Sequence, residues 1–145
     1  MGEGLGLIPA VSISTTGLDA QTRRMEATAQ NIANANTTVR PGEVAVGRQE
    51  VILAAKFASV MRNQTIEKVP AGVEIRNVVE TPRDPKKVFR PGHPDADAEG
   101  FVRMSGIDPL EEMVEMMNAT RAYEANLSAI RAGRTMAQKA LEIGK

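Results

Sequence analysis

The most chemically suggestive segment is an acidic run in which carboxylate side chains alternate with alanines. Asp95, Asp97 and Glu99 precede Gly100, a spacing that imitates the first half of an EF-hand calcium loop. The twelfth position of such a loop requires a bidentate glutamate, and this chain has Gly106 there. We therefore interpret the segment as a solvated acidic turn and expect no calcium site.

A second cluster combines methionines with glutamates near the beginning of the C-terminal segment. Met113, Met116 and Met117 would share one helix face, where thioethers could hold a soft metal such as Cu(I). Methionine also fills gaps at adaptable interfaces, and this is the interpretation we favour. The neighbouring glutamates lack the Glu-x-x-His motif of helical di-iron proteins, so they predict a solvated first helical turn favoured by the helix dipole. These residues are Glu111, Glu112 and Glu115.

The single histidine, His93, is the candidate general base, but no nucleophile or oxyanion donor is identifiable around it. With no Cys and one His, the chain lacks the ligand sets of structural zinc and haem sites and the parts of a Cys/His or Ser/His nucleophile pair. The formal net charge of zero argues against nucleic acid as a partner. We expect no catalytic residue, no metal, no cofactor and no small-molecule substrate, and hence no enzyme.

Three asparagines lie where a first helix should end: Asn31, Asn34 and Asn36. Asparagine is unfavourable inside helices and favourable in terminating turns, so these residues could simply end the helix. Buried polar residues can also set the register between packed elements. Both interpretations stay open at this point.

Proline placement divides the 145 residues into two arms and a broken middle. All eight prolines lie at Pro9, between Pro41 and Pro94, or at Pro109. We predict an N-terminal helical arm over 1–40, a small β-rich module over 41–107 and a C-terminal helical arm over 108–145. The fold class is therefore α+β.

Each arm carries an apolar stripe with alternating three- and four-residue spacing, which is typical of a coiled-coil seam. Because both arms leave the same module, we expect them to pair as one antiparallel coiled-coil domain. Asp108 should cap the second helix, Pro109 should begin it, and Gly144 should stop it. The predicted seam and subunit-interface residues are Val11, Leu18, Met25, Ile32, Met113, Met116, Tyr123, Leu127, Ile130 and Leu141.

Between the arms, short runs rich in valine and isoleucine, separated by Pro-Gly turn signals, predict strands. Residues 57–70 show no clear period, and we interpret them as a loop. The predicted strands are 44–46, 49–54, 72–80, 87–90 and 101–104.

Neither a secretory signal nor a membrane-spanning run is visible. The first basic residues are Arg23 and Arg24, so no positive region precedes the short apolar stretch near the N-terminus. The best apolar run, 51–61, is interrupted by Lys56.

Two separated motifs resemble the signatures of the bacterial flagellar axial proteins, the family of rod, hook and hook-associated subunits. Residues 31–37 (NIANANT) resemble the N-terminal signature, and residues 121–126 (RAYEAN) the C-terminal one. The family-motif residues are Asn31, Asn34, Asn36, Tyr123, Glu124 and Asn126. Further segments are similar to the basal-body rod proteins of this family: 48–51 (RQEV), 91–100 (PGHPDADAEG), 111–114 (EEMV) and 140–144 (ALEIG).

The resemblance implies a structural subunit of the basal-body proximal rod, the tubular drive shaft that transmits motor torque and surrounds the export channel. It implies, as partners, other rod subunits, copies of this chain, the MS-ring side of the basal body and the flagellar type III export apparatus. It also implies a place in the periplasmic rod, reached without a cleaved signal peptide. A small metal-binding protein that uses the methionine and acidic clusters is the alternative function, and a soluble helical adaptor is a third.

Overall fold

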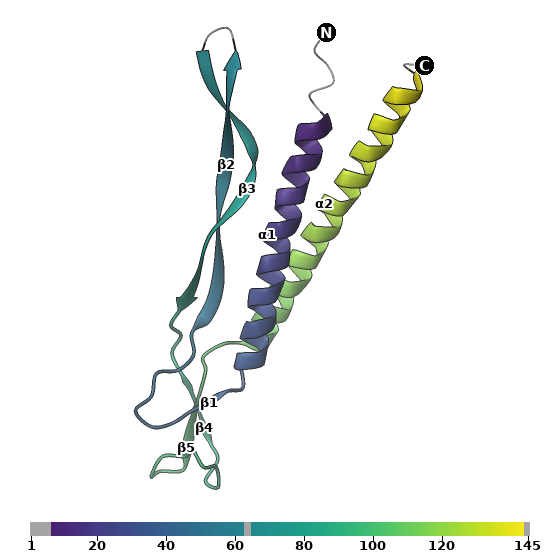
Figure 1. The fold of residues 1–145 in the computed structure, drawn as a ribbon. Helices are drawn as coiled ribbons and strands as arrows, with labels where there is room; N and C mark the ends of the chain where they lie inside the picture. The colour runs from purple at the N-terminus through teal and green to yellow at the C-terminus, as the bar shows by residue number, and fades with distance from the viewer. Residues whose placement is uncertain (1–6, 63–64, 144–145) are drawn as a thin grey trace. The chain divides into compact units, whose positions relative to one another are not determined.

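A computed structural model describes residues 7–62 and 65–143. Two long helices flank a β module in the order of the chain, so the α+β fold class is confirmed (Figure 1). The elements are α1 (Leu7–Asn34), β1 (Thr38–Val39), β2 (Arg48–Arg62), β3 (Thr65–Thr81), β4 (Lys86–Phe89), β5 (Phe101–Met104) and α2 (Pro109–Ile143). Among these residues, neither helix contains a stretch apolar enough to cross a membrane.

The chain forms two compact units, and each contains parts of both helices. The first unit comprises α1 up to Arg23, residues 52–77 of the β2–β3 sheet, and α2 from Ala119 onward. The second unit comprises residues 24–51 and 78–118, which include the end of α1, the beginning of α2 and the smaller strands.

In the first unit, small residues let the two helices approach closely. Ala20 and Ala119 are almost fully buried. A Cβ atom added to Gly17 would lie 3.0 Å from the Asn126 amide, and one added to Gly133 would lie 3.0 Å from Val11 Cγ2. Larger side chains at the two glycines would force the helices apart.

In the second unit, polar groups fix both helix ends. Leu110 N donates to Asp108 Oδ1 at 3.0 Å and α2 begins at Pro109, which confirms the predicted cap and first position. At the end of α1, the buried Ser105 hydroxyl lies 2.8 Å from the Asn34 carbonyl and 3.0 Å from that of Ala35. These carbonyls have no partner inside the helix, so Ser105 satisfies them.

The second unit also contains a three-stranded antiparallel sheet with strand order β1-β5-β4. The predicted strands at 87–90 and 101–104 are confirmed as β4 and β5, each within one residue. Val102 and Met104 of β5 are buried, and Ile107 adds to the same core. This small apolar core lies directly before α2 in the sequence.

The interpretation of residues 57–70 as a loop is wrong, because nearly all of them belong to β2 and β3, which together form a two-stranded sheet. Most side chains from Ala55 to Lys68 that the structure describes are exposed. Since neither face of this ribbon is well buried, its sequence does not alternate between apolar and polar residues. The predicted strand at 44–46 is also wrong: those residues have no regular structure. Gly144, the predicted stop, lies outside the described residues.

Candidate functional site

The carboxylate of Glu112, in the first turns of α2, accepts hydrogen bonds from two other elements of the second unit. Arg48 Nε donates to Glu112 Oε1 at 2.5 Å, and Asn31 Nδ2 donates to Glu112 Oε2 at 2.9 Å. Asn31 also binds the main chain of Gln49: its Nδ2 donates to the carbonyl at 2.9 Å, and its Oδ1 accepts from the amide at 2.8 Å. These four residues, the Glu112 cluster, tie α1, β2 and α2 together.

Burial makes the Glu112 cluster energetically important. Glu112 and Asn31 are each 1% exposed, and the Arg48 side chain is 17% exposed. The hydrogen bond to Glu112 raises the pKa of Arg48, and the charges of Glu112, Glu111 and Glu50 act in the same direction. The guanidinium therefore stays charged and compensates a carboxylate that would otherwise be buried alone.

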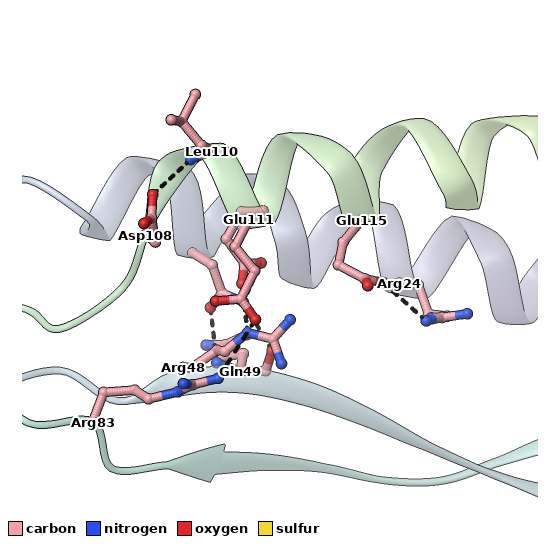
Figure 2. Close-up of polar contacts among 10 residues, drawn as sticks. Arg24, Arg48, Gln49, Arg83, Asp108, Leu110, Glu111 and Glu115 are labelled. Atoms are coloured by element: carbon pink, nitrogen blue, oxygen red, sulfur yellow. Dashed lines mark hydrogen bonds and ion pairs between the residues drawn. The ribbon is translucent and has the colours of Figure 1, made fainter.

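The prediction that all three glutamates form a solvated turn is wrong for Glu112. Glu111 and Glu115 do face solvent, where Glu111 lies 3.8 Å from Arg83 and Glu115 lies 3.2 Å from Arg24 (Figure 2). The helix dipole argument applies to Glu111 in the first turn of α2, whereas Glu112 points inward because two donors from other elements meet it.

A pocket of about 150 Å³ lies beside the Glu112 cluster, within the second unit. It is lined by Arg24, Ala27, Thr28, Arg48, Gln49, Glu50, Val51 and Glu115. The two arginines at this pocket are paired with Glu115 and Glu112, so they offer no uncompensated charge to a ligand. This arrangement can hold elements together, but it provides neither a nucleophile nor an acid–base pair.

The acidic segment is organised by main-chain hydrogen bonds. Asp97 Oδ1 accepts from the amides of Glu99 at 3.0 Å and Phe101 at 2.8 Å, the geometry of a side chain that closes a turn. Asp95 Oδ2 accepts from the Thr38 hydroxyl at 2.7 Å, which lowers the pKa of Asp95, and nearby His93 and Arg40 add to the effect. In the part of the chain that the structure describes, no group of three histidine, cysteine, aspartate or glutamate side chains gathers that could hold a metal ion.

The candidate general base has a structural partner. His93 Nδ1 accepts a hydrogen bond from the Asp95 amide at 3.2 Å and lies 3.8 Å from the Asp95 carboxylate. The side chain stabilises the turn that it belongs to.

The structure places the predicted seam residues at different depths. Most are half-buried: Val11, Leu18, Met25, Ile32, Met116, Tyr123, Leu127 and Ile130. Two are exposed: Met113 and Leu141. Of the family-motif residues, Asn31 is buried, three are half-buried (Asn34, Tyr123 and Asn126), and two are exposed (Asn36 and Glu124).

Sequence reasoning missed a contact in the first unit between α1 and β3. Thr16 Oγ1 donates to the Ile13 carbonyl at 2.7 Å and accepts from the Val73 amide at 3.0 Å. Gly72 allows this contact, since its φ of 128° lies in the region that favours glycine and an added Cβ would overlap the Thr16 hydroxyl. The turn predicted from the Pro70-Ala71-Gly72 run is wrong, because these residues lie within β3, and nothing in the sequence indicates their contact with a helix threonine.

The two ends of the chain match models of flagellar rod proteins. The model described as flagella basal body rod protein matches residues 12–41. The model described as flagellar basal body rod FlgEFG protein C-terminal matches residues 98–143. The matched stretches include both segments that carry the axial signatures.

Curated relatives match almost the whole chain. The flagellar basal-body rod protein FlgC of Bacillus subtilis (strain 168) is 39% identical over 94% of this chain and 97% of the relative. The FlgC of Salmonella typhimurium (strain LT2) is 30% identical over 97% of this chain and 100% of the relative. That of Aquifex aeolicus (strain VF5) is 33% identical over 97% and 99%. The chain therefore belongs to the FlgC family of flagellar basal-body rod proteins.

Proposed function

We propose that the chain is a non-enzymatic structural subunit of the proximal rod of the bacterial flagellar basal body. Residues 1–40 and 108–145 pair as one antiparallel coiled-coil domain, with the β-rich residues 41–107 as a separate module. These terminal helices assemble into the tubular drive shaft that transmits motor torque and surrounds the export channel. Membership of the FlgC family supports the rod assignment.

The observation that carries this proposal is the number of large apolar side chains that α2 leaves exposed. A helix that packs on one side and exposes apolar residues elsewhere presents further surface to a partner. The assembled rod would cover this surface with neighbouring subunits. The exposed residues are Leu110, Met113, Val114, Met117, Met136, Leu141 and Ile143.

The helix contacts of the first unit support the antiparallel pairing. Val11 meets the position of Gly133, and Gly17, further along α1, meets the earlier residue Asn126 of α2. Contacts that advance along one helix while they retreat along the other are those of antiparallel neighbours. Close packing through many such contacts would make the shaft stiff, since packed interiors transmit strain.

The partners and location follow from the same assignment. The subunit binds copies of itself and other rod subunits, contacts the MS-ring side of the basal body, and reaches the periplasmic rod through the type III export apparatus without a cleaved signal peptide. Subunits that bind head to tail without closing into a ring form helical tubes and filaments. Because the chain contains no native cysteine, introduced cysteines can test these contacts cleanly.

The direct test is cysteine cross-linking in intact basal bodies. Cysteines replace Leu18 and Leu127, singly and together, with Ala58→Cys on the exposed ribbon as a matched control. Products that join this chain to other rod subunits through the helix positions support the proposal. Recovery of the protein away from basal bodies, without cross-links, would contradict it.

A further inference from the structure

One face of the small sheet carries two cations directly opposite each other. The register of β4 and β5 pairs Lys87 with Arg103, and two residues further along it pairs Phe89 with Phe101. Paired residues, and residues two apart, share a face of a sheet. The two rings lie edge to face with centroids 5.2 Å apart. We call these four residues the cationic face.

Several other cations of this unit have an acidic neighbour within the chain. Lys86 lies 4.0 Å from Asp108, and Arg40 lies 3.4 Å from Asp95. Within residues 7–62 and 65–143, no ion pair involves Lys87 or Arg103. The two positive charges of the cationic face therefore have no acidic partner among the described residues, whereas the neighbouring cations Lys86 and Arg40 each have one.

Like charges directly opposite on neighbouring strands destabilise a sheet. Here the arrangement is combined with an aromatic side chain that is largely uncovered, since Phe89 is 61% exposed. An anionic partner would remove the repulsion between the two cations and would cover the exposed ring. Aromatic residues and arginine are also the types enriched where proteins bind each other.

The same unit presents carboxylates of the opposite sign. The turn between β4 and β5 carries Glu99, which is exposed and whose carboxylate has no ion pair within the described chain. Asp97 uses one carboxylate oxygen to close that turn, and it holds Glu99 in place through the Glu99 amide. A surface with a cationic patch and an acidic turn can bind a second copy of itself head to tail.

We propose that the cationic face docks the acidic turn of a second copy of this chain, with Glu99 between Lys87 and Arg103. This inference rests on the proposed function, because it specifies a contact between copies in the rod. The contact is heterologous, so each copy uses its face for one neighbour and its turn for the next. Such a contact propagates around or along a helical assembly.

A zero-length carbodiimide cross-linker tests the contact in intact basal bodies, because it joins an amine only to a carboxylate that touches it. We expect a covalent dimer of this chain joined between Lys87 and Glu99. The intrachain link between Lys86 and Asp108, whose atoms lie 4.0 Å apart, is the internal positive control. A link from Lys87 to a carboxylate of a different protein, or no Lys87 link where the control forms, would overturn the proposal.

Charge reversal supplies the second test. Lys87→Glu places a carboxylate opposite Arg103, so the isolated chain should melt at the same or a higher temperature. Its incorporation into basal bodies should nevertheless fall about tenfold or more, because like charges then meet at the contact. Combining Lys87→Glu with Glu99→Lys should raise incorporation above that of Lys87→Glu alone, because opposite charges again meet between positions 87 and 99, and Lys68→Glu on the exposed ribbon should leave incorporation unchanged.

The outcomes separate this inference from the proposed function. If wild-type chain and Lys68→Glu are both absent from basal bodies, the rod assignment itself fails. If wild-type chain incorporates and Lys87→Glu incorporates equally well, the docking contact is refuted while the rod assignment stands. If the single reversal lowers incorporation and the charge swap does not raise it again, the pairing with Glu99 is likewise refuted.

Discussion

Replacing Glu112 with alanine removes the carboxylate that joins three elements of the second unit. Arg48 would lose its hydrogen-bonded counter-charge, and the Asn31 amide would lose one of its two acceptors. Removing one partner of a buried ion pair costs about 3–5 kcal/mol. Because Arg48 is 17% exposed and borders a pocket, it can turn toward water, so we expect the lower end, about 3 kcal/mol.

The matched control is Glu115→Ala, three residues along the same helix. Glu115 pairs with Arg24 at 3.2 Å, but both side chains are exposed by more than a third. Exposed ion pairs contribute about 0–1 kcal/mol, so this control should have little effect on the free energy of unfolding. The two variants differ in burial and connectivity, while the type of residue removed is the same.

Thermal unfolding followed by circular dichroism measures both changes. At about 2–4 °C per kcal/mol for a chain of this size, Glu112→Ala should lower Tm by about 6–12 °C. Glu115→Ala should lower it by about 4 °C at most. Equal Tm values for the two variants would refute the claim that the buried carboxylate stabilises the unit.

A double-mutant cycle would confirm the pairing. Arg48→Met alone leaves Glu112 buried without its guanidinium partner, and Arg48→Met with Glu112→Met replaces both charges by apolar side chains. Removing both partners of a buried pair costs less than removing one. The double variant should therefore be more stable than the sum of the single changes predicts, by about 0.5–3 kcal/mol. Additive effects would show that the two side chains stabilise the protein independently.

Three further perturbations follow from the geometry. Gly72→Ala places a Cβ against the Thr16 hydroxyl at a backbone φ of 128°, so it should lower the free energy of unfolding by about 1–3 kcal/mol and reduce the protection of β3 amides from hydrogen exchange. Unchanged protection would contradict the close contact. Folding lowers the pKa of Asp95 below its ordinary value of 3.8, so the ionised carboxylate stabilises the folded chain above pH 3.8, and this stabilisation is lost as the pH falls through the lower pKa of the folded state. The Tm of Asp95→Asn should therefore be below that of wild type at neutral pH, and the two Tm values should converge in strong acid. Leu18→Asp should abolish rod incorporation and motility in soft agar, whereas His93→Ala should preserve both. Normal motility of Leu18→Asp would contradict the prediction that Leu18 belongs to a coiled-coil seam.

The two long helices and the beginning of α2 could be predicted from the sequence, but the predicted N-terminal helical arm of 1–40 is too long, because α1 ends at Asn34 and β1 follows within it. Proline-free segments, the cap at Asp108 and the proline after it act within a few residues, so they determine local structure regardless of what packs nearby. The strands β4 and β5 could also be identified, since β-branched residues and flanking turn signals mark them. The ribbon of β2 and β3 could not, because an exposed sheet imposes no apolar alternation on its sequence.

Family membership was likewise readable, since the axial motifs are continuous in the chain. The role of their residues was not. Asn31 could end a helix or fix a register, and both interpretations are consistent with its position in the sequence. In the folded chain it is buried and bonded to the Gln49 main chain and to Glu112, 81 residues away, so it fixes the relation between elements.

The sequence by itself thus determined the helical arms, the acidic turn and the family, because each depends on neighbouring residues. Only the tertiary structure decided that Glu112 is buried while Glu111 and Glu115 face solvent, since the charges that compensate it come from distant segments. The pairing of Lys87 with Arg103 on neighbouring strands was likewise decided only by the tertiary structure. Strand register places two cations together that the chain separates by 16 positions, and no local pattern encodes that register.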